Sequence, residues 1–263
     1  MPMNPRLLVP RATFDPDAAA YLRAVEAADG QALETPVKRA VDDFFKGCKA
    51  DGTFSALKAA CLLCGARTLA GALVPLAGTA PTNNNFVDAD YNRETGLVGN
   101  GSTKSLSANI NAINLPTLSL AVQVSTSASA QGAYIGTINI IANVSSQCVS
   151  LGAQHMTFTR GFNSNADPNR IDGAASSVTG LVGASLSGVT QTHRSGGINI
   201  VESVAVQSDP NTMFGVLGRQ TEANTFGFYS DARLAFYSIG EALDLALLDT
   251  RVTALVTAIG AAI

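Results

Sequence analysis

The sequence predicts a mainly β protein: an antiparallel β-sandwich of jelly-roll type, with a small N-terminal helical module before it and a C-terminal helix after it. Residues 105–159 run for 55 positions without one Asp, Glu, Lys or Arg. Their apolar residues alternate with Ser, Thr and Asn in short runs such as 118–124, which is typical of strands with one buried face. Turn signals recur about every 8 to 12 residues after Phe86, as they do in sandwiches.

Several protein classes are disfavoured by composition. A membrane helix needs about 18 or more consecutive apolar residues, and no run within 105–159 reaches that length. No alternation of strand and helix patterns is visible, which argues against a parallel nucleotide-binding sheet. The net charge of −3 and the pI of 5.3 create no basic field. We therefore expect no membrane span and no nucleic-acid partner.

Charge density divides the chain. Residues 15–67 carry 15 charged side chains, whereas residues 101–230 carry only 10. We accordingly predict an N-terminal helical anchoring module and linker over 1–82, the β-sandwich over 83–240, and the C-terminal helix over 241–263.

The helical module is predicted from its capping signals. Asp15-Pro16 and Thr35-Pro36 each place a capping residue before a proline, which favours a helix start. Asp29-Gly30 and Asp51-Gly52 are typical helix ends. A third helix is expected from about Phe54, where the next apolar run begins.

The cysteines predict structural roles. Cys61 and Cys64 have the spacing of a redox pair or half a zinc site, but the chain contains no second such pair. Both histidines, His155 and His193, are far away in sequence. We expect the two thiols to be small buried groups on one face of the third helix.

The C-terminal segment predicts a helix, with Asp249 as the start of the helix proper. Apolar residues recur there at alternating spacings of three and four. One interpretation is a helix docked on its own sandwich. The other is an oligomerisation seam, with a homotrimer as our guess. The seam residues are Leu245, Leu248, Val252, Leu255 and Ile259.

No catalytic, cofactor or metal site is predicted. Residues 88–92 offer alternating oxygens, but they lack the Gly and Glu of a calcium loop, so a turn with capping side chains is preferred. Residues 167–172 receive the same interpretation. The Gly-rich 99–104 has the wrong spacing for a phosphate loop and predicts a hairpin turn. Glu202 and Glu222 are the only glutamates between 95 and 240, which gives a paired-carboxylate hydrolase little support.

Five runs of sequence resemble parts of tailed-phage virion proteins. The runs AADGQALE (27–34), FFKGCKADG (44–52) and GARTLAGALVPL (65–76) resemble their helical lead-in. The run FVDADYNRETGLVGNGSTK (86–104) looks like the opening strands of their concanavalin-like, laminin-G-type jelly roll. The run RLAFYSIGEAL (233–243) is similar to its last strand and exit.

This resemblance implies a non-enzymatic structural component of a phage virion: a tail fibre, tail or head-surface decoration protein. It would be made in the host cytoplasm and attach to other virion proteins through its helical N-terminus, with the sandwich facing outward. The resemblance implies no metal or cofactor.

An alternative is a lectin-like adhesin that binds host-surface glycan as a receptor-binding protein, and a third candidate is a glycan hydrolase. Aromatic residues clustered beside Asn or Asp on one loop face would favour the adhesin, because sugars stack on rings and hydrogen-bond to amides. The candidate residues are Tyr134, Phe162, Phe214, Phe226 and Tyr229.

Overall fold

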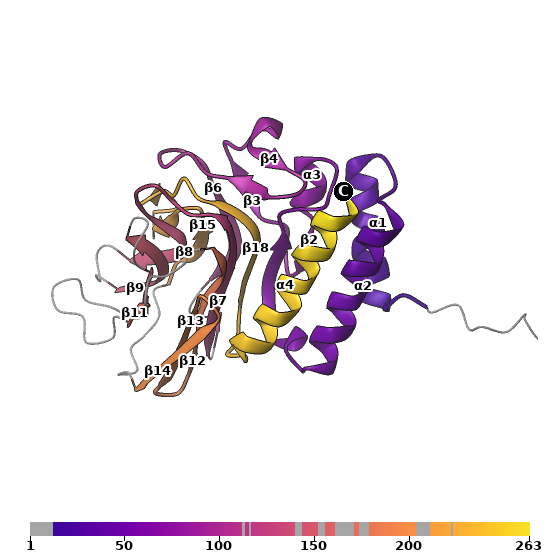
Figure 1. Ribbon diagram of the computed structural model, residues 1–263. Coiled ribbons are helices and arrows are strands. Elements are labelled where there is room, and N and C mark those ends of the chain that lie inside the picture. The colour runs from indigo at the N-terminus through magenta and orange to yellow at the C-terminus, as the bar shows by residue number, and fades with distance from the viewer. Residues whose placement is uncertain are drawn as a thin grey trace, which may run out of the picture.

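The protein is a β-sandwich with a layer of helices on one side (Figure 1). Helices α1, α2 and α4 cover the outer face of one sheet, and the second sheet packs against its inner face. The predicted mainly β sandwich with N-terminal helices and a C-terminal helix is thus confirmed. The computed structural model describes residues 13–111, 114–115, 117–139, 144–151, 156–160, 171–173, 179–203, 211–221 and 223–263.

Sheet A is antiparallel throughout its described pairs and lies between the helices and the second sheet. In order across the sheet its main strands are β14 (Ile198–Ser203), β13 (Thr190–Ser195), β12 (Gly180–Ser187), β7 (Leu118–Thr126), β18 (Arg233–Gly240), β1 (Leu57–Leu62) and β2 (Pro75–Ala77). Two short strands extend it beside β18: β5 (Gly96–Val98) and β4 (Tyr91–Asn92).

Sheet B forms the face farthest from the helices. Its main strands are β11 (Ile171–Gly173), β10 (Met156–Arg160), β9 (Val144–Leu151), β8 (Gln131–Asn139), β15 (Met213–Val216), β6 (Ser105–Asn111) and β3 (Thr82–Asn84). A small hairpin of β16 (Arg219–Thr221) and β17 (Phe226–Gly227) joins it, with β16 parallel to β8.

The first two helices form where their capping signals predict them. Helix α1 (Pro16–Asp29) begins after Asp15, whose carboxylate accepts from the backbone of the first turn, and ends at Gly30 with φ +70°. Helix α2 (Thr35–Ala50) follows, with Pro36 in its first turn. Its N-cap position is Glu34 and not the predicted Thr35, and no side chain caps this helix.

The predicted third helix is wrong. Residues Phe54–Ala56 form one 3-10 turn (η2), and the apolar run continues as strand β1. Strand β1 lies between β18 and β2 in sheet A, and its two faces are covered by the sandwich core and by the helices. A strand buried on both faces is apolar without alternation, and a short apolar run of this kind also fits a buried helix. A short helix, α3 (Leu69–Ala72), comes after β1.

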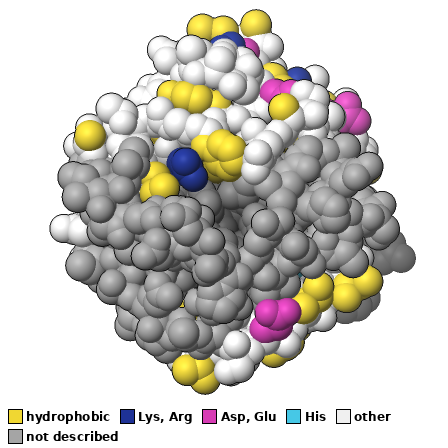
Figure 2. Space-filling model, turned by 90° about the vertical axis from the view of Figure 1, so that its left-hand side faces the viewer, with side chains coloured by type: hydrophobic (Ala, Val, Ile, Leu, Met, Phe, Trp, Pro, Cys, Tyr) yellow, Lys and Arg dark blue, Asp and Glu magenta, His cyan; other side chains and the backbone are white. Residues whose placement is uncertain are grey.

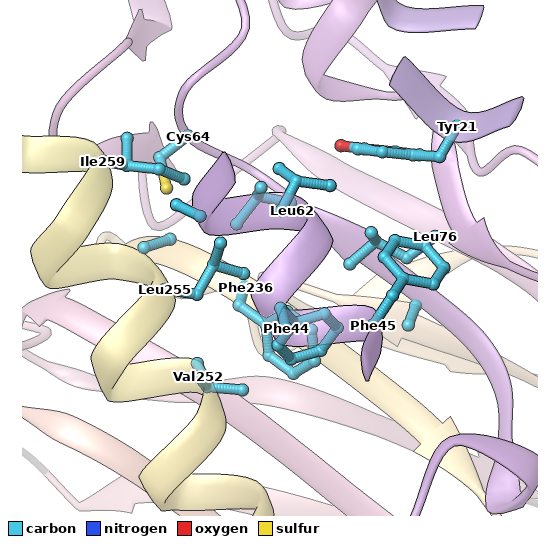
Figure 3. Close-up of a cluster of buried hydrophobic side chains, with 14 of the residues drawn as sticks. Tyr21, Phe44, Phe45, Leu62, Cys64, Leu76, Phe236, Val252, Leu255 and Ile259 are labelled. Carbon is cyan, nitrogen blue, oxygen red and sulfur yellow. The ribbon is translucent and has the colours of Figure 1, made fainter. Parts of the chain in front are cut away.

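Two apolar cores hold the layers together. Between the sheets lie side chains such as Leu106, Tyr134, Phe214 and Tyr237, all fully buried. Between sheet A and the helices lies the second core, shown in Figure 3, where Phe44 of α2 packs edge-on against Phe236 of β18 at a centroid distance of 6.2 Å. Sheet A therefore contributes both of its faces to apolar packing.

Helix α4 (Leu245–Ala262) is docked on its own chain, in line with the first interpretation of the C-terminal segment. All five seam residues lie in the core against α2 and sheet A, with exposed fractions of 2% or less. They are therefore unavailable to a partner, and the seam is not a surface for oligomerisation. The expected start at Asp249 is also wrong, because Asp244 caps a helix that begins at Leu245. By length and composition α4 could cross a membrane, but a core helix passes the same test.

The sequence predicted that an anchoring module ends at residue 82. Strands β1 and β2 lie before this residue, and β3 begins at it. They belong to the two sheets. The predicted boundary therefore does not coincide with a gap between structural elements.

Candidate functional site

The β16–β17 hairpin and the segment after it bring aromatic, amide and basic side chains together on the outer side of sheet B. We call this the hairpin patch. It consists of Arg219, Gln220, Asn224, Phe226, Phe228 and Tyr229. Figure 2 views this side of the molecule, where hydrophobic side chains lie directly beside a basic one.

The turn that precedes the patch makes room for its rings. Leu217 has φ +59° and Gly218 follows it, which reverses the chain between β15 and β16. A Cβ on Gly215 would lie 2.7 Å from Cε1 of Phe226, and one on Gly218 would lie 3.3 Å from Cδ1 of Tyr229. Two glycines thus let two rings lie directly on the backbone of sheet B.

The three aromatic residues remain half-buried, so part of each side chain faces solvent. Phe228 has φ +54°, a left-handed conformation that phenylalanine rarely adopts. Its ring lies under the Arg219 guanidinium, with Cζ at 4.8 Å from the ring centroid. Burial lowers the pKa of Arg219, which nevertheless stays charged in the ordinary pH range.

A hydrogen-bonded chain of side chains fixes the amides. Ser107 of β6 lies between two core residues, so its hydroxyl points away from the sandwich core and donates to Oε1 of Gln220 at 2.8 Å. Gln220 in turn donates from Nε2 to Oδ1 of Asn224 at 3.4 Å. Asn224 itself is exposed and has φ +57°. The buried Gln220 therefore positions an exposed amide beside the rings.

Hydroxyl groups support the hairpin from below. Thr137 of β8 is hydrogen-bonded to Thr212, and both side chains are buried. Thr221 and Thr225 pair their hydroxyls at 2.7 Å across the hairpin. These contacts pair the hydroxyl groups of the four threonines without a charged residue, which keeps this part of the base of the patch neutral.

The structure separates the aromatic candidates of the sequence into two groups. Tyr134 and Phe214 are fully buried core residues. Phe226 and Tyr229 lie together in the hairpin patch, whereas Phe162 is outside the described residues. The sequence interpretation missed Arg219, Gln220, Asn224 and Phe228. The run from Asn224 to Tyr229, a turn residue followed by three aromatics in four positions, was an available signal.

The oxygen-rich loop at 88–92 is a capped turn, as expected. Val87 donates its backbone N–H to Asp90, which also pairs with Lys104. Asn92 Oδ1 accepts from the backbone of Glu94 and Thr95 at 3.0 and 2.9 Å. Within the described ranges no group of three or more His, Cys, Asp or Glu residues could hold a metal ion.

Three other predicted features have mixed outcomes. Residues 99–104 form a turn organised by Asn100, but it connects β5 of sheet A to β6 of sheet B and is not a hairpin. Glu202 lies exposed on β14, while Glu222 and 167–170 are outside the described residues. Asp172 lies in β11.

Cys61 and Cys64 cannot act as a redox pair. Successive residues of an extended segment point to opposite faces, and Cys61 lies in the core between the sheets whereas Cys64 lies in the core under the helices. Both are fully buried, and burial raises the pKa of each thiol to about 12. The prediction of buried structural thiols is confirmed, but not the shared face. His193 is also buried, in β13, and His155 is outside the described residues.

No protein-family model and no curated protein sequence matches this chain. Among solved structures it is similar to the NanB sialidase of Streptococcus pneumoniae, with a TM-score of 0.44 and 11% identity over 58% of this chain and 26% of that one. It is also similar to the CBM40 of the Ruminococcus gnavus IT-sialidase bound to α2,3 sialyllactose (TM-score 0.40, 10% identity, 54% and 81% covered). A third similarity is to the binding domain of botulinum neurotoxin DC (TM-score 0.40, 12% identity, 62% and 42% covered). The chain thus spans about a quarter of the length of NanB. None of these three is a virion protein.

Proposed function

We propose that this chain binds carbohydrate, and that the hairpin patch is the binding surface. The observation that carries the proposal is the succession of three half-buried aromatic residues, Phe226, Phe228 and Tyr229, on one short segment beside the exposed amide of Asn224. This is the arrangement that the adhesin alternative required.

The chemistry of the patch suits a sugar. The apolar C–H face of a pyranose ring packs on an aromatic ring, and its hydroxyl groups exchange hydrogen bonds with amides and guanidinium groups. The rings already rest on Gly215 and Gly218, and Asn224 is fixed through Gln220. Little side-chain freedom is then lost on binding, which favours affinity.

A binding role fits the patch better than hydrolysis. A glycan hydrolase of the common type needs two carboxyl groups about 5 to 10 Å apart. The described residues of the patch include no carboxylate, and their ionisable groups are the Arg219 guanidinium and the Tyr229 phenol. The described part of the patch can therefore hold and orient a sugar, but it lacks the pair of carboxyl groups that a hydrolase of the common type uses.

The test is binding to an oligosaccharide array, followed by calorimetric titration with the best ligand. We expect Phe226→Ala and Tyr229→Ala each to weaken binding roughly tenfold, the loss of about 1.4 kcal/mol of ring contact. Phe14→Ala is the matched control, because this residue precedes α1 on the helical side and is 39% exposed. Absence of binding to every oligosaccharide, or equal binding by all three variants, would refute the proposal.

The virion role implied by the sequence resemblance stays a prediction. It concerns where the chain resides, so it is compatible with a sugar-binding patch on the side opposite the helices. Mass spectrometry of purified phage particles would test it directly, independently of any sugar titration.

A further inference from the structure

The outer face of sheet B continues beyond the hairpin patch as a surface of amide and hydroxyl groups around one methionine. We call it the amide extension, and it consists of Thr82, Asn109, Asn111, Asn211 and Met213. Leu106 and Ala108 of β6 lie in the core between the sheets, so the residues that alternate with them point outward. Met213 of β15 is paired with Asn111 of β6, and paired residues share a face. Asn111 is half-buried, and the other four residues are exposed.

The amides of the extension are held in fixed orientations. Asn109 donates from Nδ2 to the backbone oxygen of Ala80 at 2.8 Å and to Oγ1 of Thr82 at 3.1 Å. Asn111 donates from Nδ2 to Oδ1 of Asn211, also at 2.8 Å. Little side-chain freedom is therefore lost when a ligand binds against these amides.

Left-handed backbone conformations gather on this sheet. Every described non-glycine residue with a left-handed φ lies in a strand of sheet B or in a segment next to one: Asn85, Asn109, Leu217, Asn224 and Phe228. Such conformations cost energy and concentrate at ligand sites, where the surrounding structure imposes them. Asn109 in the extension and Asn224 in the patch are both exposed amides of this kind.

Met213 connects the extension to the hairpin patch. Its Sδ lies 3.9 Å from Oγ of Ser107, the hydroxyl group that donates to Gln220. Met213 also lies two residues before Gly215, on which the Phe226 ring rests. Two residues of an extended strand span about 7 Å. A glycan chain that starts on Phe226 can therefore reach Met213 with its next sugar unit.

This part of sheet B carries no charge. Strands β3, β6, β8, β9 and β15 contain no Asp, Glu, Lys or Arg. The charged residues in the strands of sheet B are Arg160 and Asp172, on β10 and β11 at the far edge, and Arg219 of the patch. An anionic group that is buried without a cationic partner loses its hydration without compensation. The extension therefore favours an uncharged ligand.

We propose that the carbohydrate bound by this chain is a neutral glycan of at least two linked sugar units, the second of which lies on the amide extension. This inference rests on the proposed function, because the hairpin patch supplies the first contact. One sugar stacks on Phe226. The next packs its C–H groups on Met213 and exchanges hydrogen bonds with the amides of Asn111 and Asn211.

Calorimetric titration of the full chain tests the length of the ligand. The probes are glucose, galactose, mannose and N-acetylglucosamine, each with its linear disaccharide and trisaccharide. We expect the trisaccharide of the bound series to bind roughly tenfold more tightly than its monosaccharide. A monosaccharide that binds as tightly as its trisaccharide would overturn the inference and leave sugar binding intact. Absence of binding to any sugar, neutral or acidic, would refute the proposed function and this inference together.

Galacturonic acid oligomers and sialyllactose test the charge of the ligand. We expect both to bind more weakly than the neutral trisaccharide. The affinity for the neutral trisaccharide should be the same at about 0.05 and 0.5 M NaCl, because no charged pair is formed that salt could screen. Preferential binding of an acidic oligosaccharide, weakened by salt, would overturn the neutral ligand while supporting a sugar-binding patch.

Variants of the extension test its place in the site. Asn211→Ala and Met213→Ala should each weaken trisaccharide binding roughly fivefold and leave monosaccharide binding unchanged, whereas Phe226→Ala should weaken both. Asn199→Ala is the matched control, since this exposed asparagine of β14 in sheet A is also hydrogen-bonded, to Arg194. Circular dichroism checks that each variant is folded. If only Phe226→Ala weakens binding, the patch stands and the extension is refuted.

Discussion

His193 has a buried imidazole for which the described part of the chain provides no hydrogen-bond partner at either nitrogen. Gln191, two residues earlier on the same face of β13, is fully buried with both side-chain polar atoms also unpaired. Burial lowers the pKa of His193 to about 4, because the charged form cannot be solvated there. The imidazole is therefore neutral in the folded protein at physiological pH.

This burial predicts acid sensitivity. In the unfolded chain His193 titrates near 6.5, so between pH 6.5 and 4 the unfolded state binds more protons than the folded state. Stability should be fully present above pH 6.5 and fall by roughly 3 kcal/mol by pH 4. Urea unfolding at several pH values measures this. The variant His193→Leu should lose the decrease in unfolding free energy between pH 6.5 and 4 that is due to His193, and keep the decrease that is due to carboxylates. The same pH dependence in the variant and the wild type would contradict the assignment of this decrease to His193.

At the scale of single residues, sequence reasoning succeeded where a local rule decides the outcome. Asp15 and Gly30 delimit α1 as capping chemistry requires, and Asn92 caps its own turn. Sequence reasoning did not find the role of Gln220, because the partner of this side chain, Ser107, is more than a hundred positions away in the chain. No spacing pattern predicts such a contact, which depends on how two strands and a hairpin meet.

At the scale of elements, sequence reasoning misassigned β1, which it predicted as part of a third helix. Its apolar run has no alternation, because β1 is covered by the sandwich core on one face and by the helices on the other. The run 118–124 does alternate in sequence and was recognised as a strand; it is β7 of the same sheet. Helix α4 was predicted correctly in kind, since its seam of apolar residues is periodic, and only its start was misplaced.

The burial of α4 predicts that the chain cannot dispense with it. A chain ending at Gly240 would lose five large buried side chains, each contributing about 1.5 to 3 kcal/mol. Their sum is comparable to the whole stability of a typical domain, about 5 to 15 kcal/mol. We expect this truncated chain to be unfolded or aggregated by near-UV circular dichroism. A chain ending at Gly260, which lacks three largely accessible residues, should fold; a folded chain ending at Gly240 would show that α4 is dispensable.

For the whole molecule, the second core predicts one cooperative unit. Helices α1, α2 and α4 share buried contacts with β1 and β18, so the helical layer and the sandwich should unfold together. Far-UV circular dichroism, which follows the helices, and near-UV signals of the sandwich tyrosines should give coincident thermal transitions. The fragment 83–240 lacks β1 and should not fold. Two separate transitions, or a folded fragment, would instead support the independent module predicted over 1–82.

The place of β1 in sheet A also bears on how the chain is synthesised. Leu62 of β1 is paired with Phe236 of β18, which lies 174 positions later in the chain. Strand β1 is therefore synthesised long before the strand with which it pairs. At about 5 to 20 residues per second a ribosome needs roughly 9 to 35 s to cover that distance. During this time the apolar run of β1 and the inner sides of α1 and α2 lack their final cover. The nascent chain is thus a natural client for a chaperone, and sheet A is completed only after the last strand leaves the exit tunnel.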